Sequence, residues 1–161
     1  MLNLTALRWS MMLAALWWGA ITGMSFVAVP LMFAKLGPGL AGPVAAKLFS
    51  IQSWIGLALG LGLLLLLRGQ RDAVQGSSPS EASSEQAMAS MRAVLSTMGI
   101  VVFAMLLAML QEFGVAQKIV TARSTGGDLR LWHGLGSVLV LGQWLCSATV
   151  LWRLSRGAVS R

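Results

Sequence analysis

Four long apolar stretches alternate with short polar segments along this chain of 161 residues. Each stretch offers the roughly 20 mostly apolar residues that a helix needs to cross a bilayer. What remains is too short for a separate soluble domain, so residues 1–161 are expected to form one transmembrane domain. The pattern predicts an all-α integral membrane fold, an antiparallel bundle of four transmembrane helices over 7–34, 44–67, 79–121 and 129–155.

The connection between the first two helices, residues 35–43, reads KLGPGLAGP. Its prolines and glycines are typical of a tight turn, which makes these helices antiparallel neighbours. Gly42 and Pro43 are expected to cap and to begin the second helix. Pro30 removes a backbone donor, so the first helix is expected to kink near Phe26.

The segment 68–78 is rich in serine and glutamine and has almost no large apolar side chain. Because it has little means of packing, we expect a mobile loop. Ser78-Pro79-Ser80-Glu81 matches a capping box with proline at the first helical position. The third helix is therefore expected to begin well before Met91.

Small residues recur at four-residue spacing in the first two helices, which places them on one face of each helix. In membranes such faces let two helices approach closely. Leucine at Gly19 or Gly23 is therefore expected to weaken packing. The predicted packing residues are Ala15, Gly19, Gly23, Gly56 and Gly60.

Composition supports the membrane class: the chain is 57% hydrophobic and 11% charged, with a mean hydropathy of +0.76. These values are too apolar for a soluble domain of this length. The net charge is +7, but the basic residues flank the apolar stretches instead of forming a stripe interleaved with aromatic residues. The expected partners are lipid headgroups and a second copy or another membrane protein, and not nucleic acid.

Basic residues also indicate an orientation. The termini and the serine-rich loop hold seven of them: Arg8, Arg68, Arg71, Arg92, Arg153, Arg156 and Arg161. The opposite side holds five: Lys35, Lys47, Lys118, Arg123 and Arg130. The positive-inside rule then places both termini in the cytoplasm. The membrane itself is expected to be a bacterial inner membrane.

A family resemblance rests on Pro30 and Phe33, Ala41-Gly42, Phe49 and the later His133-Gly134. Together they resemble the transmembrane protein 205-like family, a domain of unknown function, over nearly the whole chain. The chain departs from the family's continuation of His-Gly at Gly136 and Val140. The family is distantly similar to four-helix units of copper-resistance membrane proteins and of a bacterial haem-pathway oxidase, which implies an architecture and two chemistries.

The chain has few residues suited to binding haem or copper. His133 is the only histidine, so one chain cannot supply two histidines to a haem. Soft Cu(I) prefers methionine or histidine ligands, and the candidates at similar depth are Met32, Met109 and His133. Methionines in a membrane bundle are more often gap fillers, so no cofactor or metal is predicted. No catalytic set of serine, histidine and acid can be assembled.

Polar residues gather near the interface opposite the termini, where a proline-disturbed helix favours a solvated opening. We expect a small cavity there, with His133 pointing into the bundle or within reach of Glu112. The alternative is that these groups each reach headgroup water separately. The candidate polar cluster is Pro30, Lys35, Lys47, Gln52, Glu112, Lys118 and His133.

Two functions remain open from sequence. The favoured one is a non-enzymatic bundle that binds or transports a small solute or lipid, or that supports a partner doing so. The other is a redox membrane protein that handles haem or copper near His133.

The orientation can be tested at the serine-rich loop. A cysteine in place of Ser83 should not react with a membrane-impermeant reagent added outside intact cells, because that loop is expected in the cytoplasm. The parent chain, whose single cysteine is Cys146, is the control. Labelling at position 83 in intact cells would invert the topology.

Overall fold

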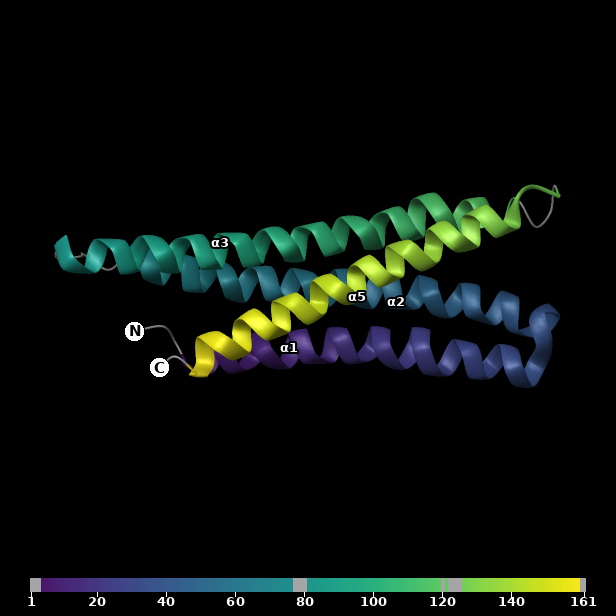
Figure 1. Ribbon diagram of the computed structural model, residues 1–161, viewed down its shortest axis with the longest axis horizontal. Helices are drawn as coiled ribbons and strands as arrows, with labels where there is room; N and C mark the ends of the chain where they lie inside the picture. The colour runs from purple at the N-terminus through teal and green to yellow at the C-terminus, as the bar shows by residue number, and fades with distance from the viewer. Residues whose placement is uncertain (1–3, 77–80, 120, 122–125, 160–161) are drawn as a thin grey trace.

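The computed structural model describes residues 4–76, 81–119, 121 and 126–159, and all its regular elements are helical (Figure 1). For residues 81–83 and 157–159 only the backbone is described. The elements are α1 (Leu4–Thr22), η1 (Gly23–Ala28), α2 (Val29–Gln75), α3 (Glu81–Met109), η2 (Leu110–Ala116) and α5 (Leu129–Val159).

Gly37 reverses the chain between the first two predicted spans. It has φ 71° and ψ 167°, and this non-helical residue joins two helices within α2. A positive φ is accessible to glycine because it lacks a Cβ, and Pro38 directly after it has the fixed φ that suits the start of a helix. The predicted nine-residue turn ending at Gly42-Pro43 is thus wrong in extent, since the helix already resumes after Gly37.

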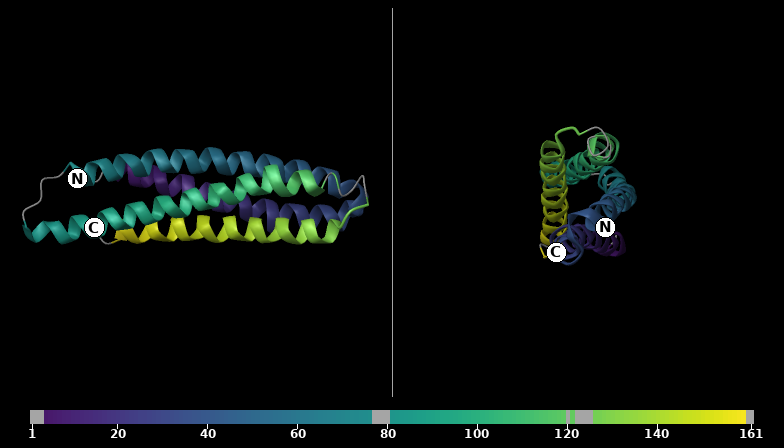
Figure 2. Two further views of the ribbon diagram at one scale, coloured as in Figure 1. Left: turned by 90° about the horizontal axis from the view of Figure 1, so that it is seen from above. Right: turned by 90° about the vertical axis from the view of Figure 1, so that its right-hand side faces the viewer.

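The long elements lie side by side, with successive limbs running in opposite directions (Figures 1 and 2). Contacts follow a ring in which α1 packs on α2, α2 on α3, α3 on α5 and α5 on α1. The start of α1 and the end of α5 lie at one end of the molecule (Figure 1).

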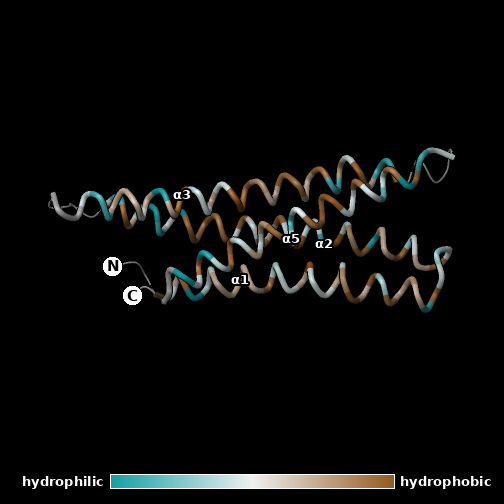
Figure 3. The backbone as a smooth tube through the Cα atoms, viewed as in Figure 1, coloured by the Kyte–Doolittle hydropathy of each residue, from teal (hydrophilic) through white to brown (hydrophobic). Residues whose placement is uncertain are grey.

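Apolar residues dominate the middle of each helix, and polar residues collect toward both ends (Figure 3). Among the described residues, three helices are long and apolar enough to cross a membrane: Leu4–Gln75, Ser84–Ile119 and Leu129–Arg156. The first of these is 72 residues long and contains the reversal at Gly37.

The serine-rich segment 68–78 differs from the predicted mobile loop. Helix α2 continues to Gln75, and Gln70 is buried, with its Nε2 3.5 Å from the Ser10 hydroxyl of α1. This contact gives a polar segment a packed face that its composition did not indicate. The capping residues 78–80 lie outside the described part, but α3 begins at Glu81, which confirms a start well before Met91.

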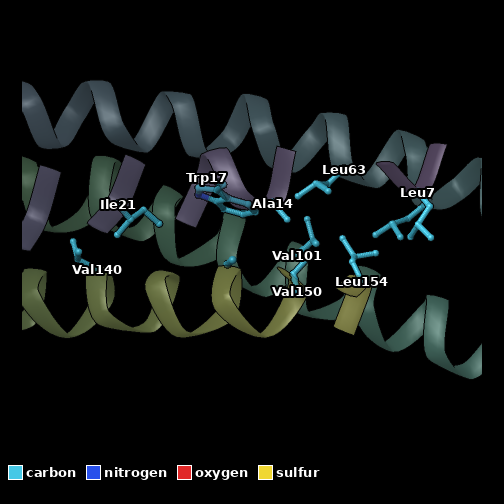
Figure 4. Close-up of a cluster of buried hydrophobic side chains, with 11 residues drawn as sticks. Leu7, Ala14, Trp17, Ile21, Leu63, Val101, Val140, Val150 and Leu154 are labelled. Atoms are coloured by element: carbon cyan, nitrogen blue, oxygen red, sulfur yellow. The ribbon is translucent and has the colours of Figure 1, made fainter. Parts of the chain in front are cut away.

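Trp17 of α1 is the largest fully buried side chain and sits in the middle of the core (Figure 4). Its indole rests against two glycines of α2. A Cβ at Gly56 would lie 3.0 Å from Trp17 Nε1, and one at Gly60 would lie 3.4 Å from the ring and 2.7 Å from Met105 Cγ. The predicted small-residue face of the second helix is therefore a close packing surface between helices, which we call the seam, and Trp17 packs against it.

The predicted small face of the first helix is not part of that seam. Ala15, Gly19 and Gly23 are exposed, and a Cβ at Gly19 or Gly23 would meet nothing within 4 Å. The helix instead buries the stripe Leu7, Ser10, Ala14, Trp17 and Ile21. The Trp17 ring occupies the space beside Gly56 and Gly60 where the small residues of the first helix were expected to pack. Those small residues therefore face outward.

This seam generates a stability prediction. Gly56→Leu should lower the free energy of unfolding by about 1–3 kcal/mol, because the rigid indole of Trp17 occupies the space a side chain needs. Thermal unfolding in detergent measures the change. Gly19→Leu is the matched control and should be tolerated, since its position is open; equal loss in both variants would contradict the assignment of the seam.

Candidate functional site

A cavity of about 450 Å³ lies between η1, the early part of α2, η2 and the first turns of α5. Its walls are mostly aliphatic and aromatic, and four polar side chains reach it: Ser25, Gln111, His133 and Ser137. The apolar part of the lining is Phe26, Val29, Phe33, Gly42, Ala45, Ala46, Phe49, Ala116, Ile119, Gly136, Val140 and Leu141.

Both π-helical segments border this cavity. Ser25 and Phe26 come from η1, and Gln111 and Ala116 from η2. A π-helix carries one extra residue per turn, is uncommon, and recurs at functional sites. In η1 the proline explains the irregular pattern, because Pro30 has no N–H to offer the Phe26 carbonyl one turn earlier. The structure thus has a π-helical segment, Gly23–Ala28, where a kink near Phe26 was expected.

One side-chain hydrogen bond connects each π-helical segment to α2. Ser25 Oγ of η1 donates to Gln52 Oε1 at 3.3 Å, and Ser50 Oγ donates to Glu112 Oε1 of η2 at 2.7 Å. Gln52 is 5% exposed, whereas Ser50 and Glu112 are half-buried. Two positions of α2 only two residues apart therefore hold both irregular segments in place.

Gln111 is the buried polar residue of the lining. It is 6% exposed, and its Oε1 has no hydrogen-bond partner. The amide lies against Gly136 of α5, where a Cβ would be 3.5 Å from Gln111 Nε2 and 3.5 Å from Val115 Cγ1. Buried polar atoms are nearly always paired, so this enclosed acceptor is an exception within the bundle.

Trp144 of α5 supports the η1 wall from behind. Its ring meets Phe26 edge-on at 5.7 Å between centroids, and its Nε1 donates to Thr22 Oγ1 at 2.9 Å. Trp18 packs on the same ring at 5.9 Å. The indole is thus fixed at both its ring and its N–H next to the cavity wall.

The predicted polar cluster is only partly brought together. His133 lines the cavity but is exposed, Gln52 is buried and accepts a hydrogen bond from Ser25, and Glu112 accepts one from Ser50. Within the described part of the chain no ion pair joins Glu112 to His133. The remaining members are exposed and absent from the lining: Pro30, Lys35, Lys47 and Lys118.

The three metal candidates are not all part of the cavity lining. His133 lines the cavity, but Met32 and Met109 do not, and Met109 is 45% exposed. Of the three candidates, the cavity lining therefore includes His133 alone.

Several lining residues escaped the sequence reading, namely Ser25, Gln111, Gly136 and Ser137. Gln111 offered a signal, since an amide inside an apolar span needs a partner in the bundle. Gly136, which departs from the family pattern, has no side chain and leaves room beside Gln111. Ser137 uses its hydroxyl on the His133 carbonyl at 3.0 Å.

The fold and the site thus define an all-helical protein with membrane-length apolar helices and an apolar cavity near the end opposite the start of α1. A family model described as domain of unknown function DUF4149 matches residues 12–128, and the chain belongs to this family. The match includes every cavity wall except the one from α5. Comparisons with curated proteins and with solved structures give no match.

The hydrogen bond from Ser50 of α2 to Glu112 of η2 leads to a further prediction. Ser50→Ala removes the donor to the half-buried Glu112 carboxyl group and should lower the free energy of unfolding by about 1 kcal/mol. Ser137→Ala is the control, because that hydroxyl bonds only to its own helix. Thermal unfolding of both variants in one detergent measures the difference, and an unchanged Ser50→Ala would mean that the bond contributes nothing.

Proposed function

We propose that this chain is a four-helix integral membrane protein whose cavity binds a small, mostly apolar molecule or lipid. Leu4–Gln75 is 72 residues long, about 110 Å as a straight helix, whereas a hydrocarbon core is about 30 Å thick. Its reversal at Gly37 suits two passes. Segments Ser84–Ile119 and Leu129–Arg156 would supply the other two.

The proposed location is a bacterial inner membrane with both termini in the cytoplasm. Exposed Trp9 and Trp152 belong to the helix ends near the termini, as an interfacial aromatic belt requires. Arg156 stacks 4.1 Å above the Trp152 ring, and Arg153 donates to Ser96 Oγ. Basic residues held at this end agree with the positive-inside orientation.

The cavity is the observation on which the proposed binding role rests. Its volume of about 450 Å³ falls within the range of about 300–1,000 Å³ typical of small-molecule sites. Such sites combine apolar walls with a few placed polar groups, which describes this lining. Its position between proposed spans gives access to molecules dissolved in the bilayer.

Four of the seven residues that suggest the transmembrane protein 205-like resemblance line this cavity: Phe33, Gly42, Phe49 and His133. A resemblance carried by cavity residues supports a shared binding role more directly than one carried by scattered core positions. We therefore place the function of the chain at this site.

The lining favours binding over reaction. Ser137 gives its proton to the His133 carbonyl of its own helix, and Ser25 gives its proton to Gln52. Neither hydroxyl donates to the imidazole, which an activated nucleophile would require. The chain is accordingly proposed as a binding or transport component, alone or with a membrane partner, and not as an enzyme.

A cavity-filling variant tests this role. Gly136→Leu should abolish saturable binding of a brominated long-chain alcohol, because the new side chain occupies the space beside Gln111. Bromine quenches tryptophan fluorescence at short range, and Trp144 adjoins the Phe26 wall. The measurement is the saturable quenching of the protein in lipid nanodiscs, above the linear background from lipid-exposed tryptophans.

Two controls make the result specific. Gly134→Leu changes the same helix two residues earlier, at an exposed position where a Cβ meets nothing within 4 Å, and should retain binding. Trp144→Phe should bind but lose the saturable signal. Saturable quenching that survives Gly136→Leu would place the ligand elsewhere and contradict the proposal.

A further inference from the structure

We propose that the cavity holds one acyl chain of an anionic phospholipid, which enters sideways from the bilayer between η1 and α5. The inference rests on the proposed binding role and names the ligand class of that site. It assigns the phosphate group of the lipid to Arg130 and His133, near the start of α5.

The cavity opens on a side of the bundle where two helices diverge. Trp144 of α5 meets Phe26 of η1 with 5.7 Å between ring centroids. Toward its start, α5 leaves α1 and lies beside the end of α3 (Figures 1 and 2). Phe26 and Leu141, on facing walls of the cavity, are 52% and 46% exposed, whereas Ala45 and Val140 of the lining are buried. The exposed apolar side chains therefore form a mouth that faces the hydrocarbon of the proposed membrane.

The lining face of α5 changes from polar to apolar with depth. His133, Ser137 and Leu141 recur every four residues and all line the cavity, so they share one face over about 12 Å of helix. Polar residues collect toward the ends of the helices and apolar residues in their middle (Figure 3). A phospholipid in a bilayer has the same order, with its head at the interface and its chains toward the centre. The site therefore suits a lipid in its ordinary orientation.

Charge at this mouth favours an anionic head group. Arg130 is exposed and lies three residues before His133, a spacing that places the two side chains on one face of α5. The two acidic residues of this end have other partners: Glu112 accepts a hydrogen bond from a serine of α2, and Asp128 accepts one from a backbone N–H in the first turn of α5. Basic residues near a membrane surface attract anionic head groups.

His133 adds a hydrogen-bond donor beside this charge. The neutral imidazole keeps one N–H and the protonated ring has two, so His133 can donate to a phosphate oxygen in either state. Arginine forms strong charge-assisted hydrogen bonds with phosphate. A phosphocholine head also carries a phosphate, but it brings a quaternary ammonium group near Arg130. An anionic phospholipid is therefore preferred over a zwitterionic one.

Lipid retention by the full-length protein tests the inference. The purified protein in detergent is equilibrated with equimolar dioleoyl phosphatidylglycerol and dioleoyl phosphatidylcholine, which have the same chains and differ in head-group charge. Native mass spectrometry then measures the complexes that hold one lipid. The parent should retain phosphatidylglycerol about fivefold more than phosphatidylcholine, the preference that one basic residue near an anionic head group gives.

Two pairs of variants locate the lipid. Ser137→Trp places a large ring at the mouth and should abolish retention, whereas Val138→Trp, at a 64% exposed position outside the lining, should not. Arg130→Gln should still retain a lipid but lose the preference, and Lys118→Gln, which changes an exposed lysine outside the lining, should keep it. Circular dichroism and gel filtration check folding, and Gly136→Leu is the second variant that fills the cavity.

The outcomes separate the inference from the proposed role. Equal or reversed retention of the two lipids by the parent, or a preference that persists in Arg130→Gln, overturns the anionic assignment. Retention that survives Ser137→Trp overturns the location of the chain in the cavity. A parent that retains neither lipid but shows saturable quenching by the brominated alcohol overturns the phospholipid and leaves a binding cavity. Absence of both overturns the proposed function itself.

Discussion

The bundle depends on the contact between Trp17 and the glycine notch of α2. A fully buried indole needs a surface of matching depth, which Gly56 and Gly60 provide because they have no side chains. Inside a membrane, helices gain little from the hydrophobic effect on meeting one another, so close van der Waals packing holds them together. This contact fixes how α1 is rotated toward α2, and with it which residues face the centre and which face outward.

Away from this seam, the packing opens into the cavity. The two π-helical segments, η1 and η2, each contribute one polar side chain to the cavity lining, Ser25 and Gln111. The bonds of Ser25 to Gln52 and of Ser50 to Glu112 anchor both segments to α2. An apolar bundle can retain such irregular segments because their side chains find partners within it. The result is a cavity with two walls anchored to α2 and one unsatisfied buried acceptor.

Membership of the DUF4149 family brings no assigned activity, so the function has to be inferred from the site. The lining holds no acidic residue, lysine or arginine and is mostly apolar, and its hydroxyls are already bonded to protein acceptors. The proposed binding role rests on this chemistry. The wall formed by α5 lies beyond the matched residues 12–128, yet it contributes His133 and Gly136. Under the proposed function, ligand selection therefore depends partly on a helix outside the family match.

The sequence by itself determined the helical class, the apolar helices, the reversal near Gly37 and the disturbance before Pro30, because these follow from local composition and from residues with restricted backbones. It also located the polar end where His133 lies. Tertiary structure alone decided which faces meet: the Ala15/Gly19/Gly23 stripe turned outward, Gln70 was buried within a segment that reads as a loop, and Gln111 rather than Glu112 reached the cavity. The physical reason is that nearly every position in these spans is apolar, so local pattern leaves the rotation of each helix open. Packing of one large ring into one notch sets that rotation.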